Sequence, residues 1–457
     1  MRWDSTSLSN SSIYQTNNIM KNIASYLKVG VLSGCLLLVS GCELDIPNPN
    51  AASDIEVLNS REGIIALSVG MRQFYSTSGL EAALLYPGVT GREMKGVATF
   101  TNVLELEAGG TDLPTFNGNI LGLWSRMQRV MAMSEQILDN APTIPTLTGG
   151  TLSGVMAHAH LFNAMALGNL ANAFEQANTE TSITDKVTFR PRAEVLAAAI
   201  AHLNEGIALI EATPASQEFT TQVTGTGFDL RNTLYAYNAR YNLYAGNYEA
   251  AISNADKVDL SKRSEFVYST LSPNPIYNTI FILAYFRPRD QFGLPAGLFE
   301  EGDARYTFYM TEPGADVAGD RVMTLAGFFN TQTSSIPVYL PDEMKLIKAE
   351  ALLRSNGSLE EAVALINQVR TQTSGDPFGV NAGLPAYSGP VTSESLLLEV
   401  YKQRSAELYL SGQKWEDSRR FGRPGPPNNL SERNRDFYPY PDQERRNNPN
   451  TPNDPAI

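Results

Sequence analysis

The sequence predicts a mostly α-helical protein, in which a scaffold of helical pairs carries long, loop-rich insertions. Apolar residues recur at three- and four-residue steps over several long segments, as they do on the buried face of a helix. Two of these helical segments share one internal spacing. The region between them instead holds many aromatic residues and prolines, which interrupt regular secondary structure.

The N-terminal region has the features of a bacterial lipoprotein signal. Lys21 and Lys28 precede an apolar run from Val29 to Val39, and Ser40-Gly41-Cys42 follows it. We therefore expect residues 1–41 to be a signal peptide, Cys42 to be lipidated and residues 42–55 to be a polar tether. A run of about a dozen apolar residues is too short for a membrane-spanning helix.

Two alternatives concern this N-terminal region. Cleavage before Cys35 is possible, because Leu32-Ser33-Gly34 has the right composition, but it leaves a short apolar run after Lys28. The residues before Met20 are polar and without pattern, so we expect translation to start at Met20 rather than at Met1. Both cysteines lie in this region, so we expect no disulfide or thiolate metal site beyond Cys42.

Four amphipathic helices are expected after the tether. Ser60 caps the first, which has Ile64, Leu67, Met71 and Phe74 on one face, and the others span residues 120–138, 155–174 and 194–210. The intervening segment 86–119 is rich in Gly, Thr and Asn, which predicts a long loop, and long ordered loops often carry function. The histidines His158, His160 and His202 lack acidic or cysteine companions at ligand spacing, so we expect them to be structural.

An internal repeat relates residues 234–258 to residues 345–369. When Gly246 is set on Gly357, the following positions agree in character: Tyr248 with Leu359, Ala251 with Ala362, Ala255 with Ile366 and Val258 with Val369. A large residue two positions after the glycine and a small residue three later is the spacing of tetratricopeptide helical pairs. Two unrelated helical hairpins are the alternative.

The aromatic region between the two pairs is the predicted ligand-binding part. Aromatic rings with nearby charged groups suit a sugar or another flat amphipathic ligand, because they combine stacking with hydrogen bonds. Residues 280–285 are expected to form a short strand. The candidate site residues are Tyr285, Phe286, Arg287, Arg289 and Phe292.

The segment from Ser393 to Arg423 combines a helical stripe with an unusual set of charges. Arg404 lies within an apolar stripe formed by Leu397, Val400, Tyr401 and Leu408, so it needs a carboxylate partner, and Glu407 and Asp417 are near candidates. Gly412 is expected to stop the helix in a left-handed conformation. A short aromatic and charged segment with Trp415, Arg420 and Phe421 follows.

This segment resembles the signature of RagB/SusD-like nutrient-binding lipoproteins. The matching residues are Arg404, Glu407, Leu408, Gly412, Trp415, Asp417, Arg420 and Gly422. The departures are Gln403, Ser411, Lys414, Ser418 and Phe421. Asp303-Ala304-Arg305, Tyr440 to Glu444 and Asn448-Pro449 also resemble family patterns. We expect the signature residues to fix the helix to the following turn rather than to bind ligand.

The resemblance extends over the whole chain and implies a division into parts. These are the signal 1–41, the tether 42–55, a first scaffold part 56–260, an aromatic insertion 261–337, a second scaffold part 338–423 and a loop tail 424–457, with 56–457 forming one SusD-like unit. The resemblance also implies an outer-membrane lipoprotein facing the cell exterior. Such a protein binds a nutrient, typically a glycan oligomer, and delivers it to a TonB-dependent (SusC-like) transporter.

Composition and missing motifs fit a binding protein better than an enzyme. The chain is 42% hydrophobic and 18% charged, enough for a large core, and its net charge of −13 argues against nucleic acid as partner. No catalytic, phosphate-binding or calcium motif is present, so we expect no enzyme activity, cofactor or metal. The alternative is a lipid-anchored hydrolase, for which Glu300, Glu301 and Asp303 are the candidate acids, or a protein-binding scaffold.

Overall fold

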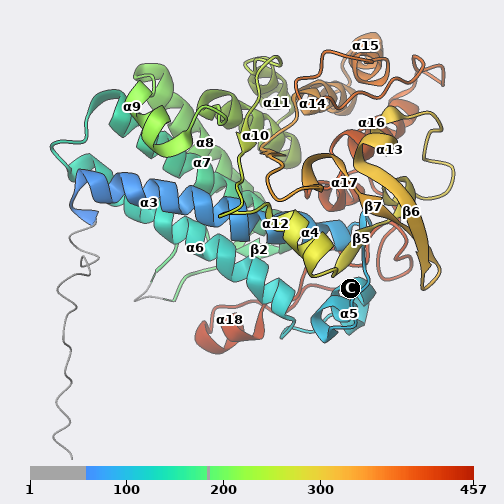
Figure 1. The fold of residues 1–457 in the computed structure, drawn as a ribbon, viewed down its shortest axis with the longest axis horizontal. Coiled ribbons are helices and arrows are strands. Elements are labelled where there is room, and N and C mark those ends of the chain that lie inside the picture. The colour runs from blue at the N-terminus through green and yellow to red at the C-terminus, as the bar shows by residue number, and fades with distance from the viewer. Residues whose placement is uncertain (1–57, 183–185) are drawn as a thin grey trace, which may run out of the picture. The chain divides into compact units, whose positions relative to one another are not determined.

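The computed structural model describes residues 58–182 and 186–457, and Figure 1 shows their fold. The predicted signal peptide, Cys42 and the tether lie outside the described residues. Helices dominate the first part of the chain: α3 Arg61–Phe74, α4 Leu80–Thr90, α5 Thr101–Ala108, α6 Gly118–Asn140, α7 Gly149–Ala173, α8 Arg192–Ala212 and the one-turn α9 Gln217–Phe219. Ser60 caps α3 as predicted, since its side chain accepts a hydrogen bond from the backbone N–H of Gly63 at 3.1 Å.

The second part of the chain contains the helical pairs and the C-terminal helices. Its helices are α10 Leu230–Ala245, α11 Tyr248–Ala255, α12 Pro275–Tyr277, α13 Ala304–Tyr309, α14 Pro341–Arg354, α15 Leu359–Arg370, α16 Ser393–Glu407, α17 Lys414–Arg420 and α18 Asp442–Asn447. Helices α10, α11, α14 and α15 lie along one edge of the molecule in Figure 1, with α16 beside them. The predicted mostly α fold with helical pairs is thereby confirmed.

The two helical pairs close through different residues. Gly246 ends α10 in the left-handed conformation, with φ of 80°, as expected for the turn of the pair. In the second pair the left-handed residue is Asn356, with φ of 54°, rather than the predicted turn glycine Gly357. The small residues Ala251 and Ala362 are fully buried, which allows the paired helices to approach closely.

Short antiparallel ladders tie the insertions to the scaffold. The strands are β1 Met94–Gly96, β2 Gln176–Ala177, β3 Arg190–Pro191, β4 Glu265–Phe266, β5 Phe286–Pro288, β6 Met310–Val317, β7 Asp320–Leu325 and β8 Ile336–Pro337, and they pair as β1–β5, β2–β3, β4–β8 and β6–β7. The β1–β5 ladder joins segments about two hundred residues apart, with Lys95 opposite Arg287. This ladder brings the predicted first loop region against the aromatic insertion.

Three sequence-based assignments were wrong. Residues 86–119 are not one loop, because α4 extends to Thr90 and α5 follows; almost every residue of α4 is buried, so the helix has no polar face and no visible stripe. Residues 278–282 form a helical turn rather than part of a strand, and the strand begins at Phe286. The tail is not only loop: it includes α18, and Tyr438 and Tyr440 are fully buried.

Among the described residues, one helix, α8, is long and apolar enough to cross a membrane by length and composition. It packs extensively against α7 and α10, and its outward positions include Glu194, Asn204, Glu205 and Glu211. Alanines give much of its apolar character. These contacts are those of a helix in the protein scaffold.

Candidate ligand-binding site

The signature segment forms a buried charge network that fixes α16, α17 and α14 together. Arg404 donates to Asp417 at 2.7 Å, which confirms one of the two predicted partners. The other predicted partner, Glu407, instead pairs with Arg305 at 3.1 Å. Glu350 accepts from Arg420 at 2.7 Å and from Arg354 at 2.7 Å.

Charge balance explains why the Glu350 carboxyl group stays ionised. Burial alone opposes ionisation of the Glu350 carboxyl, but the guanidinium groups of Arg420, Arg404 and Arg354 outweigh it and lower its pKa to about 2. Trp415 fills the same region, and its indole N–H donates to the backbone carbonyl of Arg435 at 2.6 Å. All of these contacts are within the protein, so the signature holds the scaffold together.

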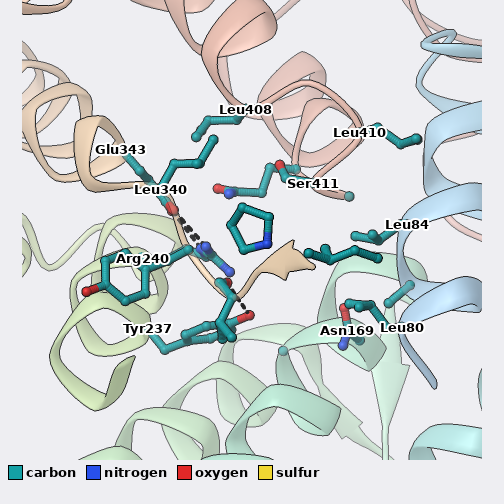
Figure 2. Close-up of a pocket in the computed structure, with 18 of the residues that line it drawn as sticks. Leu80, Leu84, Asn169, Tyr237, Arg240, Leu340, Glu343, Leu408, Leu410 and Ser411 are labelled. Carbon is teal, nitrogen blue, oxygen red and sulfur yellow. Dashed lines mark hydrogen bonds and ion pairs between the residues drawn. The ribbon is translucent and has the colours of Figure 1, made fainter. Parts of the chain in front are cut away.

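The loop between α16 and α17 closes over an interior cavity of about 70 Å³ (Figure 2). Gly412 has φ of 78°, and a Cβ there would lie 2.4 Å from the backbone oxygen of Ala83, so this close approach requires glycine. The helix itself ends at Glu407, so Gly412 shapes the loop and is not the helix stop that the sequence predicts.

The cavity has a mixed aromatic and polar lining. Arg240 and Glu343 form a two-pronged ion pair at its wall, with distances of 2.6 and 2.7 Å, as the dashed lines in Figure 2 show. Polar atoms of Tyr339, Ser411 and Gln413 lack a hydrogen-bond partner within the protein. A polar cavity of this size holds ordered water, whereas ligand pockets typically measure roughly 300–1,000 Å³. The interior cavity is therefore too small for a glycan.

The structure separates the five predicted site residues into two groups. In β5 successive side chains point to opposite sides, so Phe286 is 1% exposed while Arg287 is exposed. Phe292 is fully buried against Phe299, Tyr306 and Tyr409. The rings of Phe286 and Phe292 are thus part of the core, and the expectation that they stack on a ligand is corrected. Tyr285 and Arg289 are partly exposed.

Sequence reasoning missed Phe100, which the fold places beside Tyr285. The ring centroids of Phe100 and Tyr285 are 5.3 Å apart in an edge-to-face arrangement. The backbone N–H groups of Val97 and Ala98 both donate to the Tyr285 carbonyl, at 2.9 and 3.3 Å, which extends the β1–β5 pairing to this point. The available signal was an isolated phenylalanine between two threonines in a polar stretch.

Further exposed apolar residues adjoin this ring pair along the chain. Phe100 is 55% exposed, and Leu104, one turn further along on α5, is 51% exposed. Ile282 and Leu283 are exposed just before Tyr285. We call these five residues the Phe100–Tyr285 patch. An exposed set of apolar side chains of this kind marks a candidate binding surface.

A partly buried charge cluster lies beside the patch. Glu107 accepts from Arg92 at 3.1 Å and also pairs with Arg289, and Asp320 accepts from Arg289 at 2.6 Å and pairs with Lys95. Burial alone raises the pKa of Asp320, but hydrogen bonds from Lys95 and the charge of Arg289 outweigh it and lower that pKa. The cluster connects α5, β5 and the β6–β7 hairpin, which are neighbours in Figure 1.

The three acidic residues considered for hydrolysis do not form a suitable pair. Glu300 is bound by Arg370 at 2.7 Å and by Lys402 at 3.2 Å, and the Arg370 hydrogen bonds lower its pKa to about 2. Asp303 caps α13 and pairs with Arg305, while Glu301 is exposed. Glu300 is therefore unsuited to act as a general acid, which needs a raised pKa, and the Asp303 carboxylate is occupied by Arg305.

The histidines have structural contacts. His158 hydrogen-bonds to Ser68 at 2.9 Å, and His160 and His202 contact each other at 2.9 Å. Burial lowers the pKa of His158 well below its usual value, so this ring is neutral. Within residues 58–182 and 186–457, no group of three or more acidic, histidine or cysteine side chains is placed to hold a metal ion.

Comparison with solved structures identifies the fold as that of SusD superfamily proteins. A SusD superfamily protein from Bacteroides thetaiotaomicron matches with a TM-score of 0.67 at 15% identity, covering 86% of this chain and 99% of that chain. A putative sugar binding protein from Bacteroides vulgatus matches with a TM-score of 0.66 at 17% identity, covering 87% and 98%. B. fragilis NanU matches with a TM-score of 0.63 at 13% identity, covering 89% and 99%.

The family resemblance predicted from the signature segment is also confirmed. Residues 329–455 match the model of the SusD family, a range that contains α14 to α18 and every member of the buried charge network except Arg305. No curated protein matches the chain.

Proposed function

We propose that this protein is a surface-exposed outer-membrane lipoprotein that binds a glycan and delivers it to a TonB-dependent, SusC-like transporter. The observation that carries the proposal is the contact between exposed Phe100 and partly exposed Tyr285 on a SusD-like fold. Exposed ring faces bind sugars because the apolar face of a pyranose stacks on them while its hydroxyl groups bond to nearby polar side chains. Arg287 and the charge cluster of Lys95 and Asp320 provide such polar groups.

The comparisons support the sugar-binding part of the proposal. One similar structure is a putative sugar binding protein and another is a SusD-like carbohydrate binding protein, both from Bacteroides vulgatus. The lipobox ending at Cys42 supports membrane attachment, and the SusD-like fold supports a transporter as partner. We keep the predicted division into signal, tether, two scaffold parts, aromatic insertion and tail as part of this proposal. A transporter gene immediately upstream would support the partnership.

The binding site is tested by a double variant, Phe100→Ala with Tyr285→Ala. Each ring contributes on the order of 1 kcal/mol to stacking, so we expect glycan affinity to fall by ten- to a hundredfold while the melting temperature changes little. Calorimetry with a glycan first identified on an array measures the affinity. Phe116→Ala is the matched control, because Phe116 is 72% exposed and lies outside the patch.

Two outcomes would contradict the proposal. Unchanged affinity in the double variant places the glycan elsewhere on the protein. Release of shorter oligosaccharides from a bound glycan instead supports the alternative, a lipid-anchored hydrolase. The pairing of Glu300 and Asp303 with basic side chains disfavours that alternative, and no described feature favours a scaffold that only holds another protein.

A further inference from the structure

Strand β5 exposes one basic side chain, that of Arg287. Phe286 and Pro288 are buried, so Arg287 faces outward, whereas the Arg289 side chain is only 12% exposed and pairs with Glu107 and Asp320. The ladder continues past the strand at both ends, since the Arg289 N–H donates to the Glu93 carbonyl at 2.8 Å. The exposed Arg287 thus follows the partly exposed Tyr285 by two positions, and the Tyr285 ring contacts Phe100 and Phe286.

The β1–β5 register sets two positive charges opposite each other. Lys95 and Arg287 are direct partners in the ladder, and directly opposite residues have Cβ atoms roughly 5 Å apart. Like charges at such positions destabilise a sheet. Lys95 is compensated by Asp320 and by Glu107, the latter at 3.6 Å.

The positive charges at this place outnumber the acidic groups that bind them. Arg92, Lys95 and Arg289 share two carboxylates, those of Glu107 and Asp320. Arg287 adds a further charge, and within the described residues its side chain takes part in no ion pair or hydrogen bond. The nearby Glu105 carboxylate is directed to Asn117, whose side-chain N–H₂ donates to it at 2.8 Å.

This local excess is opposite in sign to the charge of the chain, which is −13 overall. A general electrostatic surface would be acidic and would repel an anion. A free, exposed guanidinium two residues from the Phe100–Tyr285 patch is instead suited to a carboxylate or a sulfate, which it binds through two parallel hydrogen bonds.

We propose that the glycan bound at the Phe100–Tyr285 patch is acidic, with a carboxylate or sulfate group paired to Arg287 while a sugar ring lies on Tyr285 or Phe100. This inference rests on the proposed glycan-binding function and names the class of glycan. Arg287 selects the charged residue of the glycan, and the two rings bind its apolar faces.

The experiment compares acidic glycans with neutral partners on the full-length protein. Affinity electrophoresis is run with polygalacturonate against pectic galactan for the carboxylate, and with dextran sulfate against dextran for the sulfate. The wild type, Arg287→Ala, Arg287→Lys and Arg446→Ala are compared. Arg446 is the control because its side chain is the more exposed member of a surface ion pair with Asp442.

We expect retardation by at least one acidic polymer and not by its neutral partner. A charge-assisted hydrogen-bonded contact predicts a roughly tenfold or greater loss of affinity in Arg287→Ala, with partial recovery in Arg287→Lys and no change in Arg446→Ala. Retardation by polygalacturonate indicates a carboxylate ligand, and retardation by dextran sulfate indicates a sulfate ligand. Higher salt should weaken the retention.

Two other results overturn the inference and are distinguishable from each other. Retention by neutral polymers that is lost in the Phe100→Ala, Tyr285→Ala variant but unchanged in Arg287→Ala leaves glycan binding in place and removes the acidic specificity. An equal loss with Arg446→Ala shows that acidic polymers bind through the general surface. Absence of binding to any glycan, on the array as well, contradicts the proposed function itself.

Discussion

Several buried charges near the C-terminus have more than one partner of opposite charge. Asp417 accepts from Arg404 at 2.7 Å and from Arg420 at 2.7 Å, and all three side chains are nearly inaccessible to solvent. A buried ion pair often adds little net stability, but removing one member leaves the other charged and unsolvated. Substitution of one member of a buried ion pair is therefore expected to lower the free energy of unfolding by more than the pair itself contributes.

Asp417→Ala is expected to lower the free energy of unfolding by roughly 3 kcal/mol, because the guanidinium of Arg404 keeps its charge and loses its main acceptor. Chemical denaturation measures the change. Asp442→Ala is the control, since Asp442 pairs with the exposed Arg446 and such pairs contribute under about 1 kcal/mol. Equal, small effects of the two substitutions would mean that the network is not structural.

Glu93 provides a pH-dependent contribution at the same scale. One oxygen of its buried carboxyl group accepts from the Leu410 N–H at 2.9 Å, and the other has no hydrogen-bond partner. Burial raises its pKa to about 7, although the nearby Lys414 charge opposes the shift. The folded protein thus holds this proton more tightly than the unfolded chain does. The stabilisation is fully present below the usual pKa of about 4.5 and is lost as the pH rises to about 7.

Glu93→Gln should remove this dependence while preserving the shape of the side chain. Relative to the wild type, the variant is expected to gain up to about 3 kcal/mol in the free energy of unfolding between pH 5 and pH 7.5. Urea unfolding at several pH values measures the difference. Exposed Glu62→Gln provides the comparison. A constant difference between Glu93→Gln and wild type across this range would show that Glu93 is ionised throughout.

At the scale of secondary structure, the helical pairs depend on small residues where two helices meet. Ala362 on α15 is fully buried against the α14 and α16 side of the core, whereas Ala364 on the same helix is exposed. A larger side chain at position 362 must displace packed neighbours. A larger side chain at position 364 extends into solvent.

Ala362→Leu is expected to destabilise the protein by about 1–3 kcal/mol, while Ala364→Leu should change stability by less than about 0.5 kcal/mol. Thermal unfolding monitored by circular dichroism compares the two variants. If the Ala362→Leu variant has the same melting temperature as the wild type, the interface between the paired helices has room for three more carbon atoms. The close approach of the helices inferred from the repeat would then be incorrect.

At the scale of the whole molecule, the proposed anchor and the proposed binding patch lie in different parts of the chain. Cys42 lies outside the described residues, whereas the helical scaffold and the Phe100–Tyr285 patch fall within one compact unit. We propose that a lipid chain on Cys42 sets where the protein acts. The net charge of −13 would repel the phosphates of a nucleic acid.

Cys42→Ala is expected to shift the protein from the membrane fraction to the soluble fraction, because the proposed acylation requires the Cys42 thiol. Glycan affinity should remain unchanged. Fractionation and immunoblotting of cells that produce each variant measure the distribution. Cys35→Ala is the control, and loss of membrane attachment in that variant instead would place the processing site at Cys35.

Several features that depend on local patterns could be predicted from the amino-acid sequence. Helical periodicity and the cap at Ser60 located α3, and the spacing of Ala251 and Ala362 located the helical pairs. The charge pattern around Arg404 predicted the pairing with Asp417, because a buried guanidinium needs a carboxylate nearby. The same segment indicated the SusD/RagB resemblance.

Features that depend on contacts between distant parts of the chain became visible only in the folded structure. Helix α4 is covered on all sides, so its sequence lacks the polar face that would reveal a helix. Alternation along β5 separates buried Phe286 from exposed Arg287, and that alternation becomes readable only once the strand boundaries are known. Phe100 contacts Tyr285 because the backbones of β1 and β5 pair. Every residue except proline has the same main-chain N–H and C=O groups, so such pairing cannot be recognised from the side chains in the sequence.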